Sequence, residues 1–587
     1  MILKALYDYY QHFKKEIPYG WMKIRVSFLI VLDIDGTFIR IEDCRDSKGN
    51  GLSIIAPKGQ HTTAPTPMLL WDNVMYALDY SKNPTNKTRE KHLSFVERCK
   101  DVSSRYNNKS LLAVSLFYER NELAKVKNDP LWEELKKNPE VIVSFKIHGS
   151  LFDILKEDCF EDIIKEEDVA KRAYCTKSVC LITGKKTEIV RIATNTPILH
   201  CKSSAKLVSF QKSSGYDSYG KEQANNAPIS LEAEFGFSTA LSLLTEQGSR
   251  NKFVVGNRTF VFWASNTDEA STKAEESLFV MLGIQEDKYD PNASIEEVHK
   301  VFRAINSGEL KTSLDDRFYI LGLAPNSARI AVVYWSELVL RDFATNIKNH
   351  FERMNIVLPR SYKKLTYMGL RTILSAVTLG GNSSEVTPNL PEAIAKSVFE
   401  DTTYPISLFT ACLCRLKTDS HDEEWDSFNL VDNIYKIRKI DTYIARFAII
   451  KAFINKTFQN DIKEMLDKQN TNQGYLCGRL FAILERIQEI SNRDKEYFTN
   501  VRSRYMSRAS SEPAVVFPTM LSLSVHHSEK IENINEIVKY EKLKQEIIDN
   551  ITDFPAHLSL HDQGRFFVGY YHQRQALFVY NEDQTND

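Results

Sequence analysis

The hydrophobic periodicity of this 587-residue chain changes near residue 340. Before that point, short strand-like runs at residues 24–32, 37–41, 188–193, 207–210 and 259–264 alternate with loops and helical segments. After it, apolar residues recur at helical spacing, and the pattern predicts a helix over residues 434–458. We therefore expect an α+β protein with a β-rich N-terminal half of mixed α/β modules and a C-terminal helical bundle.

Shifts in composition predict four parts. Residues 1–145 form an α+β region with a β-hairpin, and residues 146–340 form a basic β-rich module. Two runs at 318–323 and 330–335 flank a turn sequence and predict a pair of strands within that module. Residues 341–464 are predicted to be helical. Residues 465–587 form the C-terminal bundle, in which an apolar stripe from Leu476 to Ile490 has two arginines along its edge.

The sequence carries no feature of a secreted or membrane-spanning protein. The N-terminus lacks a long apolar stretch followed by a cleavage site, and no run approaches the ~18 apolar residues of a membrane span. The nine cysteines have no disulfide-like spacing. Cys175, Cys180, His200 and Cys201 come closest to a metal site, but their spacing is atypical of zinc ligands. We expect a cytoplasmic protein with reduced thiols and no bound metal.

The formal net charge of -1 conceals strongly charged segments. Residues 82–109 contain eight basic and three acidic residues, and residues 171–221 contain ten basic and two acidic ones. Residues 151–168 are the reverse, with eight acidic residues and two lysines. In the second basic segment the lysines lie among Ser, Gly, Asn and Tyr, which can bond phosphates or stack on bases. This pattern favours contact with nucleic acid; a solvated loop is the alternative.

The string FLIVLDIDGT resembles the DxDGT signature of haloacid-dehalogenase-like phosphatases, in which Asp33 would be the nucleophile and Asp35 the general acid. The competing interpretation is a β-hairpin with a type I′ turn at Asp35-Gly36, because residues 37–41 alternate like a second strand. We favour the hairpin. The chain has no phosphate-binding loop, HExxH or GxSxG motif, so we predict a protein without catalytic residues or a cofactor.

Ten strings along the chain resemble one family, the large subunit of the type I-C CRISPR Cascade complex (the Csd-one or Cas-eight-c family). They are MILKALYDYY, VLDIDG, LLWDN, CLITG, VSFQKSSGYDSYGKEQANNAPIS, FWA, YILGLAPNSARI, YLCGRLFAILERIQ, RYMSRASSEPAVVFP and FPAHLSLHDQGRFFVGYYHQRQALF. Together the strings span nearly the whole chain, and their number and order argue against a chance resemblance. The family commonly has asparagine after VSF, where this chain has Gln211.

The resemblance implies a non-catalytic subunit of an RNA-guided DNA-targeting complex. Its N-terminal part would recognise the protospacer-adjacent motif in double-stranded DNA and help to open the duplex and form the R-loop. The implied partners are the guide CRISPR RNA, the target duplex and its displaced strand, the Cascade backbone and guide-end-binding subunits, small subunits and the helicase-nuclease. The C-terminal bundle is similar to a small subunit that the family also makes from an internal start, for which Met465 would give a 123-residue product.

Two loops and the C-terminal arginines provide the candidate contacts. Motif reading needs short polar groups, as in the loop with Lys48, Asn50, Lys58, Gln60 and His61. Nearby Trp71 is predicted to anchor the core. Contacts with phosphates or strands are expected from Lys202, Lys206, Lys212, Tyr216, Tyr219, Lys221, Asn225 and Asn226, with a structural turn network as the alternative around Asn225-Asn226. Arg479, Arg486, Arg502, Arg504, Arg508 and Arg574 would contact a displaced strand or neighbouring subunits.

Two other functions remain open from the sequence. One is a magnesium-dependent phosphatase using Asp33 and Asp35. The other is a scaffold that binds single-stranded nucleic acid without preference for a motif.

Overall fold

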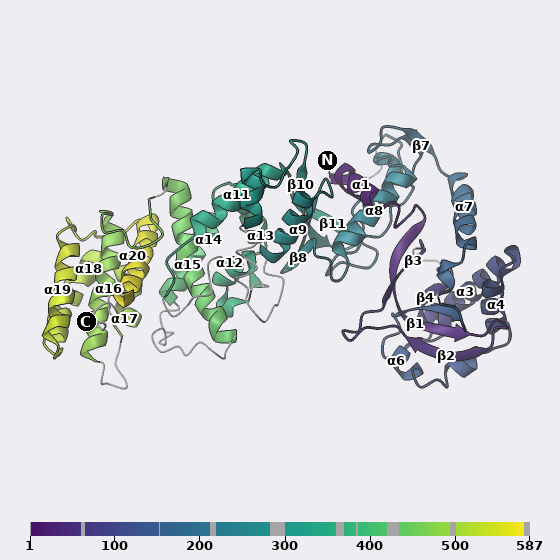
Figure 1. Ribbon diagram of the computed structural model, residues 1–587, viewed down its shortest axis with the longest axis horizontal. Helices are drawn as coiled ribbons and strands as arrows, with labels where there is room; N and C mark the ends of the chain where they lie inside the picture. Colours follow the sequence, from purple (N-terminus) through teal and green to yellow (C-terminus); the bar gives the residue numbers. More distant parts are fainter. Residues whose placement is uncertain are drawn as a thin grey trace. The chain divides into compact units, whose positions relative to one another are not determined.

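A computed structural model gives the fold of the chain. It describes all residues except 1, 60, 62–64, 152, 212–218, 282–299, 360–368, 383–384, 419–433, 460, 493–499 and 580–587. The chain divides into two compact units, the first formed by residues 1–197, 201–243 and 326–330, the second by 198–200, 244–325 and 331–587. The strands lie in the N-terminal half and helices fill the rest, which confirms the α+β class (Figure 1). The division into four parts stays a prediction.

The first unit is built on a five-stranded sheet. Its central strand β1 (Trp21–Leu32) pairs antiparallel with β2 (Phe38–Asp43) and β3 (Leu52–Pro57) and parallel with β5 (Ile142–Ile147), which pairs with β4 (Trp71–Asn73). The last five residues of β1, from Phe28 to Leu32, form an unbroken apolar run, and all of them are buried, as expected for a central strand. The remaining elements of this part are α1 (Ile2–Phe13), α2 (Val74–Leu78), α3 (Asn86–Arg105), α4 (Lys109–Glu119), α5 (Leu123–Val126), α6 (Trp132–Lys137), η1 (Ile154–Lys156), α7 (Cys159–Arg172), β6 (Lys177–Val179), β7 (Lys186–Glu188), η2 (Gln223–Asn226) and α8 (Leu231–Thr245).

The DxDGT string forms the predicted hairpin between β1 and β2. The predicted type I′ turn is wrong, because that turn needs positive φ at both central residues and only Gly36 has it, at +86°. Instead the Gly36 N–H donates to the Asp33 carbonyl (2.9 Å) and the Asp33 N–H donates to the Thr37 carbonyl (2.8 Å). The chain then returns antiparallel, whereas the phosphatase interpretation needs a crossover helix after β1.

The second unit begins with a four-stranded antiparallel sheet in the order β11-β10-β9-β8. Strands β10 (Arg317–Asn326) and β11 (Arg329–Val339) confirm the predicted pair around the turn sequence, and β9 (Arg258–Ala264) confirms the run at 259–264. The two edge strands are β8 (Lys252–Val255) and β11. In the first unit, β1 and β2 confirm the runs predicted at residues 24–32 and 37–41. Of the run predicted at residues 188–193, only Glu188 lies in a strand, at the end of β7, and the prediction of a strand at residues 207–210 is wrong.

Helices complete the second unit. They are α9 (Glu269–Met281), α11 (Leu340–Met354), α12 (Leu370–Ala376), η3 (Leu379–Gly381), α13 (Leu390–Phe399), α14 (Ile406–Thr418), α15 (Ile434–Phe458), α16 (Gln473–Ser491), α17 (Val501–Ala509), α18 (Pro513–Ser528), α19 (Ile534–Ile548) and α20 (Leu560–Val579). Helix α15 has the predicted bounds. Among the residues that the structure describes, none of these helices combines the length and the apolar character that crossing a bilayer requires.

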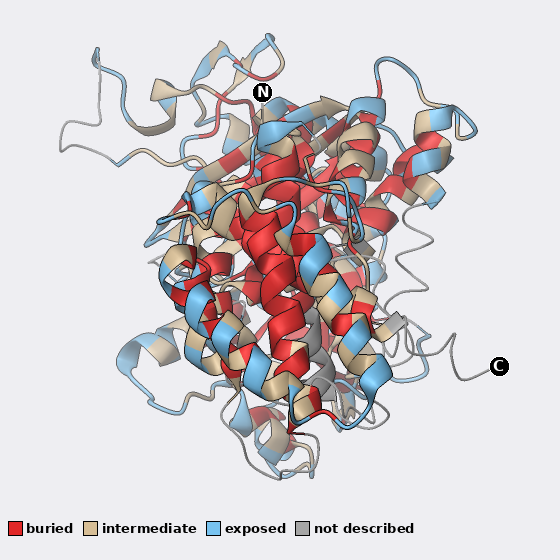
Figure 2. Ribbon diagram, turned by 90° about the vertical axis from the view of Figure 1, so that its left-hand side faces the viewer, coloured by how far each residue is buried: buried red, intermediate tan, exposed pale blue. Residues whose placement is uncertain are grey.

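Helix α16 is buried on every side, so the predicted apolar stripe has no exposed polar face opposite it. It packs against α17, α18, α19 and α20, and buried turns occupy the middle of this helical group in Figure 2. Glycines let α16 and α20 approach closely, since a Cβ at Gly474 would lie 2.5 Å from the Asp562 carbonyl oxygen. Because α20 also packs against α15, a product starting at Met465 would expose that face of α20.

Candidate nucleic-acid interface

The loop between β2 and β3 presents Lys48 and uses Asn50 internally. The Asp46 carboxylate accepts the backbone N–H groups of Lys48 (2.9 Å) and Asn50 (2.8 Å), and the Asn50 amide donates to its second oxygen (3.1 Å). These bonds, the one from the Asn50 side chain above all, lower the pKa of Asp46. The Asn50 amide therefore shapes the loop, while the Lys48 side chain is exposed.

Lys58 packs against α8. Its Nζ lies 4.6 Å from the centroid of the Phe235 ring and 3.5 Å from the Ser238 Oγ, and its N–H donates to the Gly20 carbonyl (2.7 Å). Burial lowers the pKa of Lys58, and the charge of Glu234 opposes that effect. Lys58 therefore ties the end of β3 to α8.

His61 is held by a buried carboxylate. Its Nε2 lies 3.0 Å from the Oδ1 of fully buried Asp72, its Nδ1 lies 3.0 Å from the Thr66 carbonyl, and its ring stacks on Tyr76. Burial works against the charged imidazole, but the hydrogen bond to Asp72 and the Asp72 charge raise the pKa of His61 overall. Gln60 lies outside the described residues. Trp71 is buried and donates to the Pro57 carbonyl (3.2 Å), which confirms it as an anchor.

If the chain reads a motif in duplex DNA, as the resemblance implies, replacing Lys58 with alanine is expected to weaken binding of a motif-bearing duplex by about five-fold, because the contact with α8 contributes ~1 kcal/mol to holding the end of β3. The salt dependence of binding should stay unchanged, since no phosphate contact is lost. Lys58→Met, which keeps the packed stem, should bind more tightly than Lys58→Ala. Anisotropy titrations at several salt concentrations measure both quantities. A salt slope that falls by about one in both variants would instead make Lys58 a phosphate contact.

The residues predicted to contact phosphates or strands also divide into side chains held by the protein and side chains that are exposed. The Lys206 ammonium donates to the Ala193 carbonyl, and burial lowers its pKa, opposed by the charge of Glu234. Lys202 is exposed; its backbone N–H donates to the Ser327 carbonyl (3.4 Å) and its carbonyl accepts the Ala205 N–H (2.9 Å). Lys212 and Tyr216 lie outside the described residues.

The stem of the second loop combines two exposed side chains with a turn network. Tyr219 is 100% exposed with φ at +52°, and Lys221 is exposed as well. The Asn226 amide donates to the carbonyls of Lys221 (3.1 Å) and Gln223 (3.0 Å), and Asn225 accepts a hydrogen bond from the Thr176 hydroxyl (3.3 Å). The two asparagines thus take part in a structural turn network, the alternative to contact with nucleic acid.

Opposite charge runs meet in the fold. On α3, Arg98 pairs with Glu167 (2.9 Å) and Arg105 with Glu166 (3.6 Å), so the first basic segment contacts the acidic helix α7. Arg172 at the end of α7 pairs with Asp168 (2.5 Å). The linear charge sums cannot reveal this pairing. Exposed cations remain in both basic segments, among them Lys87 and Lys109 in the first and Lys185, Lys186, Lys202 and Lys221 in the second.

Four of the six C-terminal arginines are largely buried between helices. Arg479 donates to the Gln573 side chain (3.0 Å), Arg502 donates to the Tyr443 hydroxyl (2.5 Å), and Arg486 donates to Glu489 (3.0 Å). Arg574 donates to both Glu485 (2.7 Å) and Glu489 (2.9 Å). The edge position expected for Arg479 and Arg486 is wrong because α16 has neighbours on all sides. Arg504 and Arg508 are exposed, and Arg508 pairs with Glu512 (2.9 Å).

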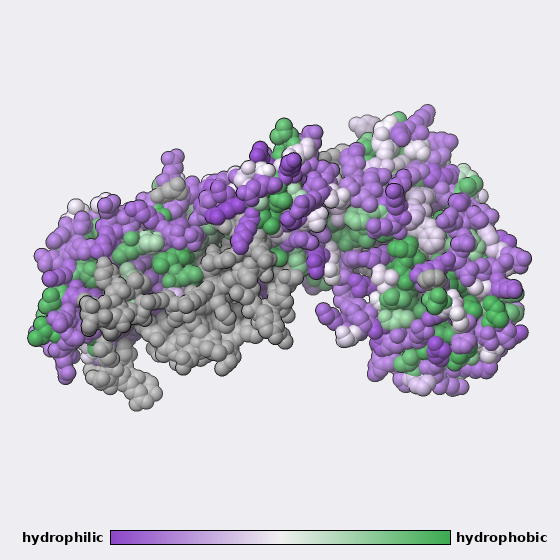
Figure 3. Space-filling model, viewed as in Figure 1, coloured by the Kyte–Doolittle hydropathy of each residue, from purple (hydrophilic) through white to green (hydrophobic). Residues whose placement is uncertain are grey.

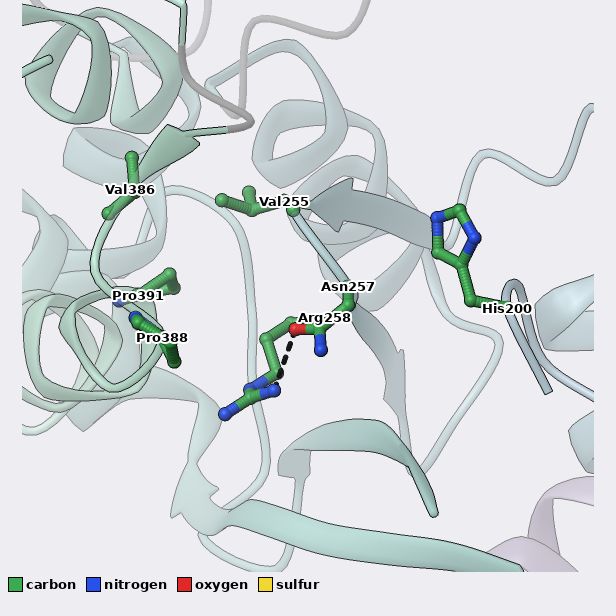
Figure 4. A pocket seen from close by; sticks show the side chains of 8 residues that line it. His200, Val255, Asn257, Arg258, Val386, Pro388 and Pro391 are labelled. Carbon is green, nitrogen blue, oxygen red and sulfur yellow. Dashed lines mark hydrogen bonds between the residues drawn. The ribbon is translucent and has the colours of Figure 1, made fainter. Parts of the chain in front are cut away.

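A cavity of about 370 Å³ lies in the second unit (Figure 4). Its one arginine, Arg258, is neutralised by Glu392 (2.5 Å) and bonded to Asn257 (2.7 Å), as the dashed line shows. Its lining consists of His200, Val255, Gly256, Asn257, Arg258, Val386, Pro388 and Pro391. Across the described residues, no three or more His, Cys, Asp or Glu side chains gather as metal ligands would. Cys180 accepts the Ser230 N–H instead (3.2 Å).

Comparison with known families matches residues 6–578 to the family described as CRISPR-associated protein (Cas_Csd1). No curated protein matches the chain. The family match covers nearly all of both units, and membership implies a multi-subunit complex with guide RNA and DNA. The chain therefore belongs to the CRISPR-associated Csd1 family, the large subunits of type I-C Cascade.

Proposed function

We propose that this chain is the non-catalytic large subunit that recognises the protospacer-adjacent motif in double-stranded DNA, assists duplex opening and R-loop formation, and helps to recruit the helicase-nuclease in the cytoplasm. Its partners would be the guide RNA, the target duplex with its displaced strand, the Cascade backbone and guide-end-binding subunits, and small subunits. In such a complex, base pairing reads the target and the protein reads only a short motif.

The observation that carries this proposal is the exposed basic surface of the first unit. The side chains of Lys48 and Lys202 are exposed. Lys58, His61 and Lys206, in contrast, are held by intramolecular partners. Exposed lysines suit phosphate contacts, and the held residues suit a loop of fixed shape. For the C-terminal helices, the proposal of strand or subunit contact rests on Arg504 and Arg508.

The other two functions have less support. The turn after β1 leads into an antiparallel strand, and the Asp35 carboxylate is engaged by the Thr37 N–H (2.9 Å) and Arg120 (3.1 Å). These contacts are those of a turn and do not favour a phosphatase. A scaffold that binds single-stranded nucleic acid without motif preference would not distinguish duplexes that carry the motif from duplexes that lack it.

Competition binding with the assembled complex tests the proposal. The parent should bind a target duplex with the correct motif at least about ten-fold more tightly than one with an altered motif. Lys48→Ala and Lys202→Ala should each reduce the salt slope by about one, with smaller affinity for both duplexes. Lys136→Ala/Lys137→Ala on α6, whose lysines pair with Glu133 and Glu134, is the matched control. Equal affinity for both duplexes would identify a motif-independent scaffold, and magnesium-dependent phosphatase activity abolished by Asp33→Asn would identify an enzyme.

A further inference from the structure

Two tyrosines beside the β6–β7 hairpin are almost completely exposed. Tyr174 is 93% exposed and Tyr219 is 100% exposed, whereas large aromatic side chains usually bury most of their surface. Tyr174 lies two residues before Thr176, whose hydroxyl bonds to Asn225 in the same short stem as Tyr219. The segments that carry the two tyrosines therefore meet beside β6, at the Thr176–Asn225 hydrogen bond.

The hairpin between these tyrosines is basic. Lys185 and Lys186 at its turn are exposed, and so is Lys221 in the neighbouring stem. Lys177 is exposed and pairs with Glu188 (3.2 Å), a carboxylate that Arg172 also contacts (3.4 Å). Glu222 is a further carboxylate in the stem, so cations outnumber anions here. Figure 3 shows hydrophilic residues with a few apolar ones at the place where Figure 1 labels β7.

Backbone hydrogen bonds hold the hairpin in one place. Its turn is tied to the segment before α8 by the Leu181 N–H, which donates to the Pro228 carbonyl (2.9 Å), and Val190 bonds to Ile229 (3.0 Å). Ile182 in the turn is buried, and Gly184 supplies the positive φ of +70°. The exposed rings and ammonium groups thus project from an ordered support, which limits the entropy lost on binding.

We propose that Tyr174, Lys177, Lys185, Lys186, Tyr219 and Lys221, here called the hairpin platform, bind single-stranded nucleic acid. Exposed aromatic faces stack on unpaired bases, and neighbouring lysines neutralise the phosphates between them. A duplex hides its base faces between neighbouring pairs, so the rings favour a single strand. The inference rests on the proposed function and assigns a strand-holding surface within it. This surface is separate from the predicted motif-reading residues on either side of β3.

Binding of a fluorescent oligothymidylate of about twenty nucleotides to the full chain, alone and in the assembled complex, tests the platform. Tyr174→Ala/Tyr219→Ala should weaken binding by at least about ten-fold, and Tyr174→Phe/Tyr219→Phe should bind like the parent, because stacking persists without the hydroxyls. An abasic oligomer of equal length should bind the parent and the alanine variant equally. Lys185→Ala/Lys186→Ala should lower the salt slope by about 1.4.

Lys136→Ala/Lys137→Ala removes two adjacent lysines elsewhere in the first unit and should leave oligothymidylate binding unchanged. Parental affinity in the tyrosine-to-alanine variant would overturn the proposal. Equal losses on oligothymidylate and on duplex would replace it with a duplex backbone contact. Motif preference is measured separately, by competition between duplexes with the correct and the altered motif for the parent complex. The platform can therefore fail while the proposed function holds, and the reverse.

Discussion

Gly478→Ala is expected to destabilise the C-terminal helices by about 3 kcal/mol or more. A Cβ at this position would collide with the carbonyl oxygen of Phe566 and lie 2.8 Å from both the Phe566 carbonyl carbon and the Tyr570 nitrogen. All three atoms belong to the backbone of α20, so no side chain can turn away to make room.

Intrinsic helix propensity acts in the opposite direction but is the smaller effect. Alanine favours a helix interior by ~1 kcal/mol over glycine. To admit the Cβ, α16 and α20 must separate along a contact that Gly474 and Gly569 also keep short. Separation loses dispersion contacts over many buried side chains, and that loss exceeds the gain in propensity.

Gly564→Ala on α20 is the matched control. There the added Cβ would meet side-chain atoms of Phe409 (2.8 Å) and Ile450 (3.0 Å), which can shift, so the loss should be clearly smaller. Hydrogen exchange of peptides from α16 and α20 in the full-length chain reports the opening free energy of these helices directly. Protection in Gly478→Ala equal to that of the parent would contradict the close backbone contact.

Acidification is expected to destabilise the second unit through two buried histidines. Burial, reinforced by Arg353 and opposed by Asp401, lowers the pKa of His350 to about 3. Burial likewise lowers the pKa of His572 to about 3, with Lys451 reinforcing and Asp467 opposing the shift. Each ring faces a tyrosine hydroxyl, Tyr404 for His350 (2.8 Å) and Tyr475 for His572 (3.0 Å).

The sign follows from where the protons bind. Below about pH 6.5 the unfolded chain protonates both imidazoles, while the folded chain keeps them neutral until about pH 3. Stability is therefore complete above pH 6.5 and falls on acidification by about 1.4 kcal/mol per pH unit for each histidine. Carboxylates with ordinary pKa values add to acid destabilisation mainly below about pH 5.

Hydrogen exchange between pH 6.5 and 5, corrected for the intrinsic rate, measures the effect in α16 and α20. The opening constant should rise about ten-fold per pH unit for each histidine that the opening exposes. His572→Gln keeps a polar side chain but removes the titration, so its pH slope should fall by one proton whatever its stability at neutral pH. An unchanged slope in His572→Gln would show that His572 is not buried as a neutral ring.

Several features could be predicted from local patterns because short-range physics fixes them. The β1–β2 hairpin, the β10–β11 pair, the bounds of α15 and the burial of Trp71 all follow from periodicity, turn residues and apolar runs. The turn type was mispredicted because Asp-Gly suits several hairpin turns and the register of pairing selects among them. Resemblance in ten strings also indicated the family before any fold was known.

Only the tertiary structure decided which polar groups remain available at the surface. Lys58 and His61 have the composition of a reading loop, yet α8 and Asp72 hold them, because contacts between distant segments satisfy buried polar groups first. Arg479 lies on a helix that its sequence makes amphipathic, but the helices around α16 bury it. By itself the sequence determined the α+β class, the family and the abundance of local positive charge. Folding decided which of those charges face solvent.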